Sequence, residues 1–336
     1  MPSLNPAPAS PTDSPATADE ATRRGHPYRA YVLRAALGLL VVGLLLRHYD
    51  AKPVLAMLGR EKIAYFAAAV VIYLSGQLIS ALRWRILALM VGISGRYREF
   101  VAYCFVGMFT NLFLPGLIGG DAARAFYLGR RCGRLGAATA ATVADRGSGL
   151  LALFWLAGAC ALLPIGRLLP KPITTPVIAV AGLTILGYVF TPLIASLLQR
   201  IPGRIATVIA AVLPYLNRPA SLIPAIVLSF ALQVLLAIGQ YALAVGLGLG
   251  ISLWLLVLCV PIANVFASLP LTINGLGVRE SAYVVLLGSA GMRDTDAIAL
   301  GLLWFACTTV AGLVGGVVFV SSDLPKIRLE KEPRSD

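Results

Sequence analysis

Two stretches of this chain place charged residues, glycine and proline inside long apolar runs. They are NLFLPGLIGGDAAR, residues 111–124, and NVFASLPLTINGLGVRE, residues 264–280. Arginine binds phosphate through forked hydrogen bonds, and a nearby carboxylate can hold the arginine when no ligand is bound or carry a proton. These residue types predict a site that binds an anionic group.

The first stretch has the pattern of a helix that breaks within a membrane. Pro115 lacks a backbone donor, Gly119 and Gly120 loosen the backbone, and Asp121 can cap a new helix that contains Arg124. Loose backbone at membrane depth is tolerated only where protein buries it or water fills a cavity. Broken helices often mark substrate sites in transporters, but a loop between two ordinary spans would contain proline and glycine in the same way.

The second stretch repeats this spacing, because Arg279 lies nine residues after Pro270 and Arg124 lies nine residues after Pro115. A pair of Gly/Pro-interrupted apolar segments in corresponding halves of a chain indicates a transporter site. The repeated pattern is short, so chance remains an alternative to an inverted repeat.

A third charged pair, Asp145 and Arg146, lies near the start of an apolar run. Asp145 can pair with the arginine of either broken segment, and Arg146 with Asp121 or Glu280. The alternative is that the pair anchors a span at the cytoplasmic interface. We expect the six charges of these three segments to line one water-accessible cavity. The candidate substrate-binding residues are Asn111, Pro115, Gly119, Gly120, Asp121, Arg124, Asp145, Arg146, Asn274, Gly275, Gly277, Arg279 and Glu280.

Other polar residues in the apolar runs have simpler interpretations. Arg83, Trp84 and Arg85 are typical of an interface anchor, to which we assign no chemistry. Gln77 and Gln233 are interpreted as hydrogen-bonding links between helices.

The composition indicates an all-α polytopic membrane protein. The chain is 58% hydrophobic and 13% charged, with a mean hydropathy of +0.84, whereas soluble domains have about 25% charged residues. The net charge of +13 does not indicate nucleic-acid binding, because the basic residues cluster between apolar runs. Two histidines and five scattered cysteines predict neither a metal centre nor a cofactor, and no catalytic triad or nucleotide-binding loop is recognisable.

The chain should form one transmembrane domain at 30–322, between a disordered N-terminal tail at 1–29 and a C-terminal tail at 323–336. A count of Lys and Arg gives 19 on the inner side and 7 on the outer side if both tails are cytoplasmic. The two halves are then inverted, with broken segments that enter from opposite faces. The predicted spans are 30–46, 63–82, 140–163, 173–195, 221–247 and 297–320, and the predicted re-entrant or broken helical hairpins are 99–131 and 252–290.

Three motifs, NLFLPGLIGGDAARAFYL, ATVADRGSGLLAL and SLPLTINGLGVRESAYVVLLG, resemble the flippase-like family. This family comprises the transmembrane part of lysylphosphatidylglycerol synthase and its stand-alone relatives. The resemblance covers nearly all of the chain after about residue 30 and implies movement of lipids or lipid-linked molecules between leaflets. The sequence ends with KIRLEKEPRSD, so we expect no aminoacyl-transfer domain, and lysyl transfer does not follow from the resemblance.

The function that we expect is therefore translocation of a lipid with an anionic or zwitterionic headgroup across the cytoplasmic (inner) membrane. The lipid is the expected partner, and a separate lipid-modifying enzyme is a second partner that we consider. Two alternatives stay open: an integral-membrane lipid or glycan transferase, and an accessory subunit without transport of its own.

Overall fold

The computed structural model describes residues 51–59, 61–113, 118–199, 212–268 and 275–321, together with residues 40, 43, 44 and 47. Within these residues the chain folds into helices and forms no strand, which confirms the predicted all-α class. Both predicted tails and most of the predicted first span lie outside the described residues, as do the candidate residues Pro115 and Asn274.

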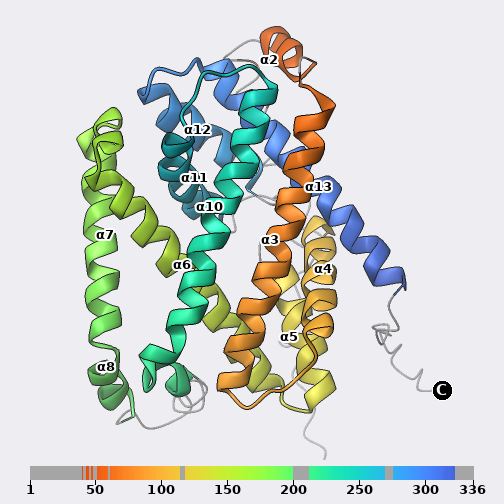
Figure 1. Cartoon of the computed structure of the whole chain (residues 1–336), viewed down its shortest axis with the longest axis vertical. Helices are drawn as coiled ribbons and strands as arrows, with labels where there is room; N and C mark the ends of the chain where they lie inside the picture. Colours follow the sequence, from red (N-terminus) through yellow and green to blue (C-terminus); the bar gives the residue numbers. More distant parts are fainter. Residues whose placement is uncertain are drawn as a thin grey trace, which may run out of the picture.

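Within the described residues, five long helices form the frame of the bundle (Figure 1). The segments 63–90, 171–189, 219–246 and 294–321 are apolar and long enough to cross a membrane. The fifth long helix has 28 residues and contains Asp145 and Arg146, and about 20 residues suffice for a span. The five helices are α3 (Ile63–Met90), α6 (Leu135–Leu162), α7 (Lys171–Val189), α10 (Ile223–Gly246) and α13 (Asp294–Ser321).

Four shorter helices form two hairpins, as the proline and glycine positions predict. α4 (Tyr97–Phe113) and α5 (Ile118–Cys132) form the first, and α11 (Leu253–Ser268) and α12 (Val278–Ser289) form the second. Each has 17 residues or fewer. In Figure 1 the first hairpin occupies the lower half of the molecule and the second occupies the upper half. The hairpins therefore enter the bundle from opposite ends.

The remaining labelled elements are short; one precedes α3, and the other three lie between α6 and α10 in the sequence. They are α2 (Ala51–Leu58), the 3-10 helix η1 (Pro164–Leu168), α8 (Thr191–Leu198) and the 3-10 helix η2 (Pro219–Leu222).

The helix packing relates the two halves of the bundle to each other. If α3, α4, α5 and α6 correspond to α10, α11, α12 and α13, each contact between halves has a counterpart. α13 packs on α4 and α6 packs on α11; α3 packs on α13 and α10 packs on α6. α3 and α10 also pack on each other, so this pair corresponds to itself. This pattern is the one that a two-fold internal repeat produces, whether the two halves are parallel or inverted.

Each hairpin packs into a separate apolar cluster that it shares with the long helices. The first hairpin buries Trp84, Phe100, Tyr103 and Tyr127 in one cluster, where Trp84 and Phe100 pack edge to face with ring centroids 5.0 Å apart. The second hairpin lies in a larger cluster with α10 and α13, which includes the fully buried Tyr283. The hairpins are therefore folded units within the bundle and not loose loops.

Glycines allow the two helices of the first hairpin to approach closely. A Cβ atom on Gly120 would collide with the carbonyl oxygen of Gly107 and with the amide of Asn111. The Asn111 Oδ1 atom accepts a hydrogen bond from the Gly120 backbone N–H at 2.7 Å. This bond satisfies one of the backbone donors that a helix start leaves without an intrahelical partner.

We expect Gly120→Ala to lower the free energy of unfolding by about 1–3 kcal/mol, because the added methyl group overpacks a backbone contact. The measurement is thermal unfolding of the purified protein in detergent. Gly182→Ala is the matched control in α7, where a Cβ meets no atom within 4 Å, and it should raise helix stability slightly. Equal stability of the two variants would contradict the packing described here.

Candidate functional site

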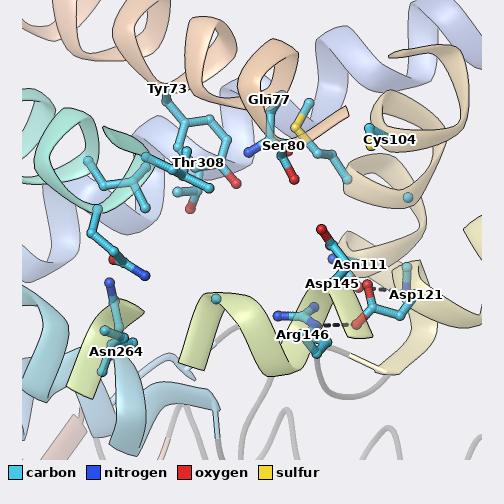
Figure 2. Close-up of a pocket in the computed structure, with 18 of the residues that line it drawn as sticks. Tyr73, Gln77, Ser80, Cys104, Asn111, Asp121, Asp145, Arg146, Asn264 and Thr308 are labelled. Atoms are coloured by element: carbon cyan, nitrogen blue, oxygen red, sulfur yellow. Dashed lines mark hydrogen bonds and ion pairs between the residues drawn. The ribbon is translucent and has the colours of Figure 1, made fainter. Parts of the chain in front are cut away.

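A cavity of about 440 Å³ lies between the two hairpins (Figure 2). Eight helices contribute to its wall: α3, α4, α5, α6, α10, α11, α12 and α13. Its polar and charged lining residues are Tyr73, Gln77, Ser80, Arg83, Cys104, Asn111, Asp121, Arg124, Asp145, Arg146, Gln233, Asn264, Arg279 and Thr308.

Five of these side chains form one continuous chain of ion pairs across α3, α5 and α6. Arg83 Nε lies 2.7 Å from Asp145 Oδ1, and Arg124 Nη2 lies 3.3 Å from Asp145 Oδ2. Arg124 also pairs with Asp121, and Asp121 pairs in turn with Arg146. Because it contains three arginines and two aspartates, this series of ion pairs, called the ion-pair chain below, carries one surplus positive charge.

The exposure of the side chains rises from one end of this ion-pair chain to the other. Arg83 and Asp145 are 8% and 2% exposed, Asp121 is 16% exposed, and Arg146 is 42% exposed. The buried end is fixed from several sides, whereas Arg146 is held by its partners at an accessible wall. Among the three arginines of the ion-pair chain, Arg146 is therefore the one that a ligand can reach with the least rearrangement.

The interpretation of Arg83 and Trp84 as an interface anchor is wrong. α3 continues to Met90 instead of ending near residue 82, so both side chains are buried inside the bundle. Arg83 Nη1 donates a hydrogen bond to Ser229 Oγ of α10 at 2.9 Å, and the Arg124 guanidinium lies 5.1 Å from the centroid of the Trp84 ring. A signal was present in the sequence, because Gly76, Ser80 and Arg83 share one helical face.

The structure brings seven of the candidate residues to the cavity wall: Asn111, Gly120, Asp121, Arg124, Asp145, Arg146 and Arg279. Of the expected pairings, Asp145 pairs with Arg124 and not with Arg279, and Arg146 pairs with Asp121 and not with Glu280. Asp121 lies in the first turn of α5, which begins at Ile118, so it is not the residue that caps this helix.

Four other candidates lie outside the cavity wall, namely Gly119, Gly275, Gly277 and Glu280. The Gly277 N–H donates to Glu280 Oε2 at 2.6 Å, so Glu280 holds the start of α12. Gly275 and Gly277 have φ values of +75° and +83°, which glycine adopts without strain. The expectation that all six charges line the cavity is therefore wrong for Glu280, which is fully buried behind the wall.

The two ends of the cavity differ in chemistry. Figure 2 shows Asp121, Asp145 and Arg146 at one end and Tyr73, Thr308 and Asn264 toward the other. Arg279 of α12 also lines the cavity and is 7% exposed. The wall thus offers guanidinium groups for an anion, and amides and hydroxyls for uncharged polar groups. Among the described residues, no group of three or more His, Cys, Asp or Glu side chains could hold a metal ion.

We expect Asp145→Ala to destabilise the protein by about 3–5 kcal/mol, because it leaves two buried arginines without their shared carboxylate. Unfolding in detergent measures this loss. The double variant Arg83→Met with Asp145→Ala removes one of the two stranded charges and should recover part of the stability. A single variant as stable as the wild type would show that this ion-pair chain does not hold α3, α5 and α6 together.

Comparison with known proteins gives a match to one family across most of the chain. The family model described as Lysylphosphatidylglycerol synthase TM region matches residues 31–316. No curated protein and no solved structure matches the chain. The matched range includes both hairpins and every described residue of the cavity wall. The chain belongs to the family of the lysylphosphatidylglycerol synthase transmembrane region.

Proposed function

We propose that this protein moves a lipid with an anionic or zwitterionic headgroup, or a lipid-linked molecule, between the leaflets of a membrane. The observation that carries this proposal is the charged cavity, which lies between opposed hairpins in an apolar bundle. Ionisable side chains inside a membrane protein are costly and typically mark the pathway of a substrate or an ion. The family supports a role connected with membrane lipids.

The ion-pair chain suits a phosphate headgroup. Arginine can donate two parallel hydrogen bonds to phosphate, as it does to a carboxylate. A phosphate that replaces Asp121 beside Arg146 keeps this arginine neutralised. The surplus positive charge of the ion-pair chain also favours binding of an anion. Asp121 stays paired with Arg124 during this exchange, so no carboxylate is left alone. The ligand thus enters by exchanging one ion pair for another.

The hairpins supply the route. We infer that each hairpin re-enters the membrane from its own face and turns back near the middle, since its helices are too short to cross. Polar backbone at the turns is tolerated where it is buried in protein or lines a water-filled cavity. Inverted halves around a central site are the arrangement on which alternating access rests.

The expected test is leaflet exchange of fluorescent phosphatidylglycerol by purified protein in liposomes. Arg146→Gln should reduce the exchange rate by about tenfold or more, since a hydrogen bond to a charged group contributes about 1.5–3 kcal/mol. Its yield and unfolding temperature should stay near wild type because Arg146 is partly exposed. Arg130→Gln, at an exposed position outside the cavity, is the control.

Absence of exchange above protein-free liposomes would overturn the proposed function. A covalently changed lipid would instead support a membrane transferase. Exchange by Arg146→Gln at the wild-type rate would remove Arg146 from the headgroup site while leaving the transport itself in place.

We also propose that the protein lies in the cytoplasmic membrane with both tails in the cytoplasm. The end of α5 then faces the cytoplasm, and the connection between α12 and α13 faces outward. In a cysteine-free variant, Ser289→Cys should react with an impermeant thiol reagent added to intact cells, whereas Arg130→Cys should react only after permeabilisation. Both positions are exposed. The opposite labelling pattern would reverse the orientation.

A further inference from the structure

A second hollow, of about 640 Å³, lies between α6 and α7 on one side and α11 and α12 on the other. Pockets for small molecules commonly have volumes of about 300–1,000 Å³, so its size suits a ligand or a substantial part of one. We call this hollow the apolar crevice. Its lining residues are Leu153, Phe154, Ala157, Pro172, Ile173, Pro176, Val177, Val180, Ile262, Val265, Phe266, Val278, Ser281, Ala282, Val285 and Leu286.

The apolar crevice offers almost no polar group to an occupant. Ser281 supplies its one hydroxyl, and that hydroxyl already donates to the Gly277 carbonyl oxygen at 2.8 Å. A polar occupant would lose its hydrogen bonds to water and find few in return, at a cost of several kcal/mol. The lining therefore selects hydrocarbon.

Two side chains indicate that the apolar crevice opens to the surface of the bundle. Phe266 and Val285 both line it, and they are 49% and 57% exposed. Phe266 belongs to α11 and Val285 to α12, and both helices are part of the apolar bundle. Hydrocarbon can thus enter the crevice from the side, between α7 and the second hairpin.

The apolar crevice and the charged cavity meet at one residue. Leu153 of α6 lines both, and it is 5% exposed. Arg146 lies seven residues earlier on α6, which is about two helical turns or 10 Å along the axis. A headgroup at Arg146 and hydrocarbon beyond Leu153 are thus separated by a distance that one lipid molecule can bridge.

We propose that the apolar crevice holds an acyl chain of the same lipid whose headgroup lies in the charged cavity, with Leu153 as the partition between them. This inference rests on the proposed function and names its substrate class: a phosphate-bearing lipid with at least one long acyl chain, and not a water-soluble anion. The two hollows share the Leu153 side chain as a wall, and this adjacency commits the crevice to this occupant and not to a helix of another protein.

Photo-crosslinking tests the occupant directly. The probe is phosphatidylglycerol with a diazirine near the end of one acyl chain, incorporated with the wild-type protein into liposomes. Crosslinks should concentrate on the faces of α7, α11 and α12 that line the crevice. Crosslinks spread evenly over exposed apolar residues such as Leu313 of α13 would show contact with bulk lipid only and would overturn the proposal.

Filling the crevice with a large side chain tests whether its occupation by an acyl chain is needed for transport. Ala282→Trp places a large ring in the crevice, and Ala68→Trp places the same ring at an exposed position of α3 outside both hollows. Displacing even two methylene groups should weaken lipid binding about tenfold. Ala282→Trp should therefore lower crosslinking and phosphatidylglycerol exchange about tenfold, while Ala68→Trp should match the wild type.

The two proposals can fail separately. If the wild type exchanges lipid and Ala282→Trp exchanges it equally fast, the crevice proposal is wrong and the transport proposal stands. If the wild type exchanges no lipid, the proposed function fails, and the crosslinking pattern still decides whether an acyl chain occupies the crevice. Because Ala282→Trp could disturb folding, Val285→Trp at the exposed mouth of the crevice serves as a second variant.

Discussion

The burial of charge inside an apolar bundle is the constraint on which the rest of this structure depends. Arg83 and Asp145 are nearly inaccessible and would be too costly to bury singly. The ion-pair chain from Arg83 to Arg146 lowers this cost by giving each aspartate two arginines, so that every charge has an oppositely charged neighbour and one positive charge is left in excess. Buried ion pairs of this kind rarely add stability relative to apolar side chains. Their presence therefore fits the binding of a lipid headgroup proposed above.

The broken helices follow from the same constraint. A charged group at membrane depth needs polar neighbours, and a helix that ends there supplies backbone groups that an unbroken helix keeps for itself. The cost is that backbone groups at the helix ends lose their intrahelical partners, and the described ends of the hairpin helices compensate for this by close packing and side-chain hydrogen bonds. Gly120 lies against Gly107 so tightly that neither helix of the first hairpin has room for a side chain there, and Asn111 binds the freed backbone N–H. Glu280 performs the corresponding task at the start of α12.

Proline, glycine and charge spacing predicted the hairpins and seven residues of the cavity wall, because these signals are local. The partners of the charges were not local. Asp145 meets Arg83 because α3 continues eight residues beyond its predicted end and crosses α6, and no spacing within either helix records this crossing. Glu280 was expected in the cavity because it is charged and follows a long uncharged run, whereas its position relative to the start of a helix was unknown. Only the observed start of α12 shows that it is placed to cap the helix.

The scaffold is symmetric, but its charges are not. Gln77 and Gln233 each occupy the fifteenth position of a 28-residue segment, 63–90 and 219–246, and both line the cavity. The ion-pair chain has no such counterpart, since Arg279 is the one charged residue that the described part of the second half contributes to the wall. The hydrogen bond from Arg83 to Ser229 connects the ion-pair chain to α10. The two-fold relation exchanges α3 with α10, so this pair of helices corresponds to itself. Under the proposed function, we expect the headgroup site to stay with this pair while the hairpins open on alternate faces.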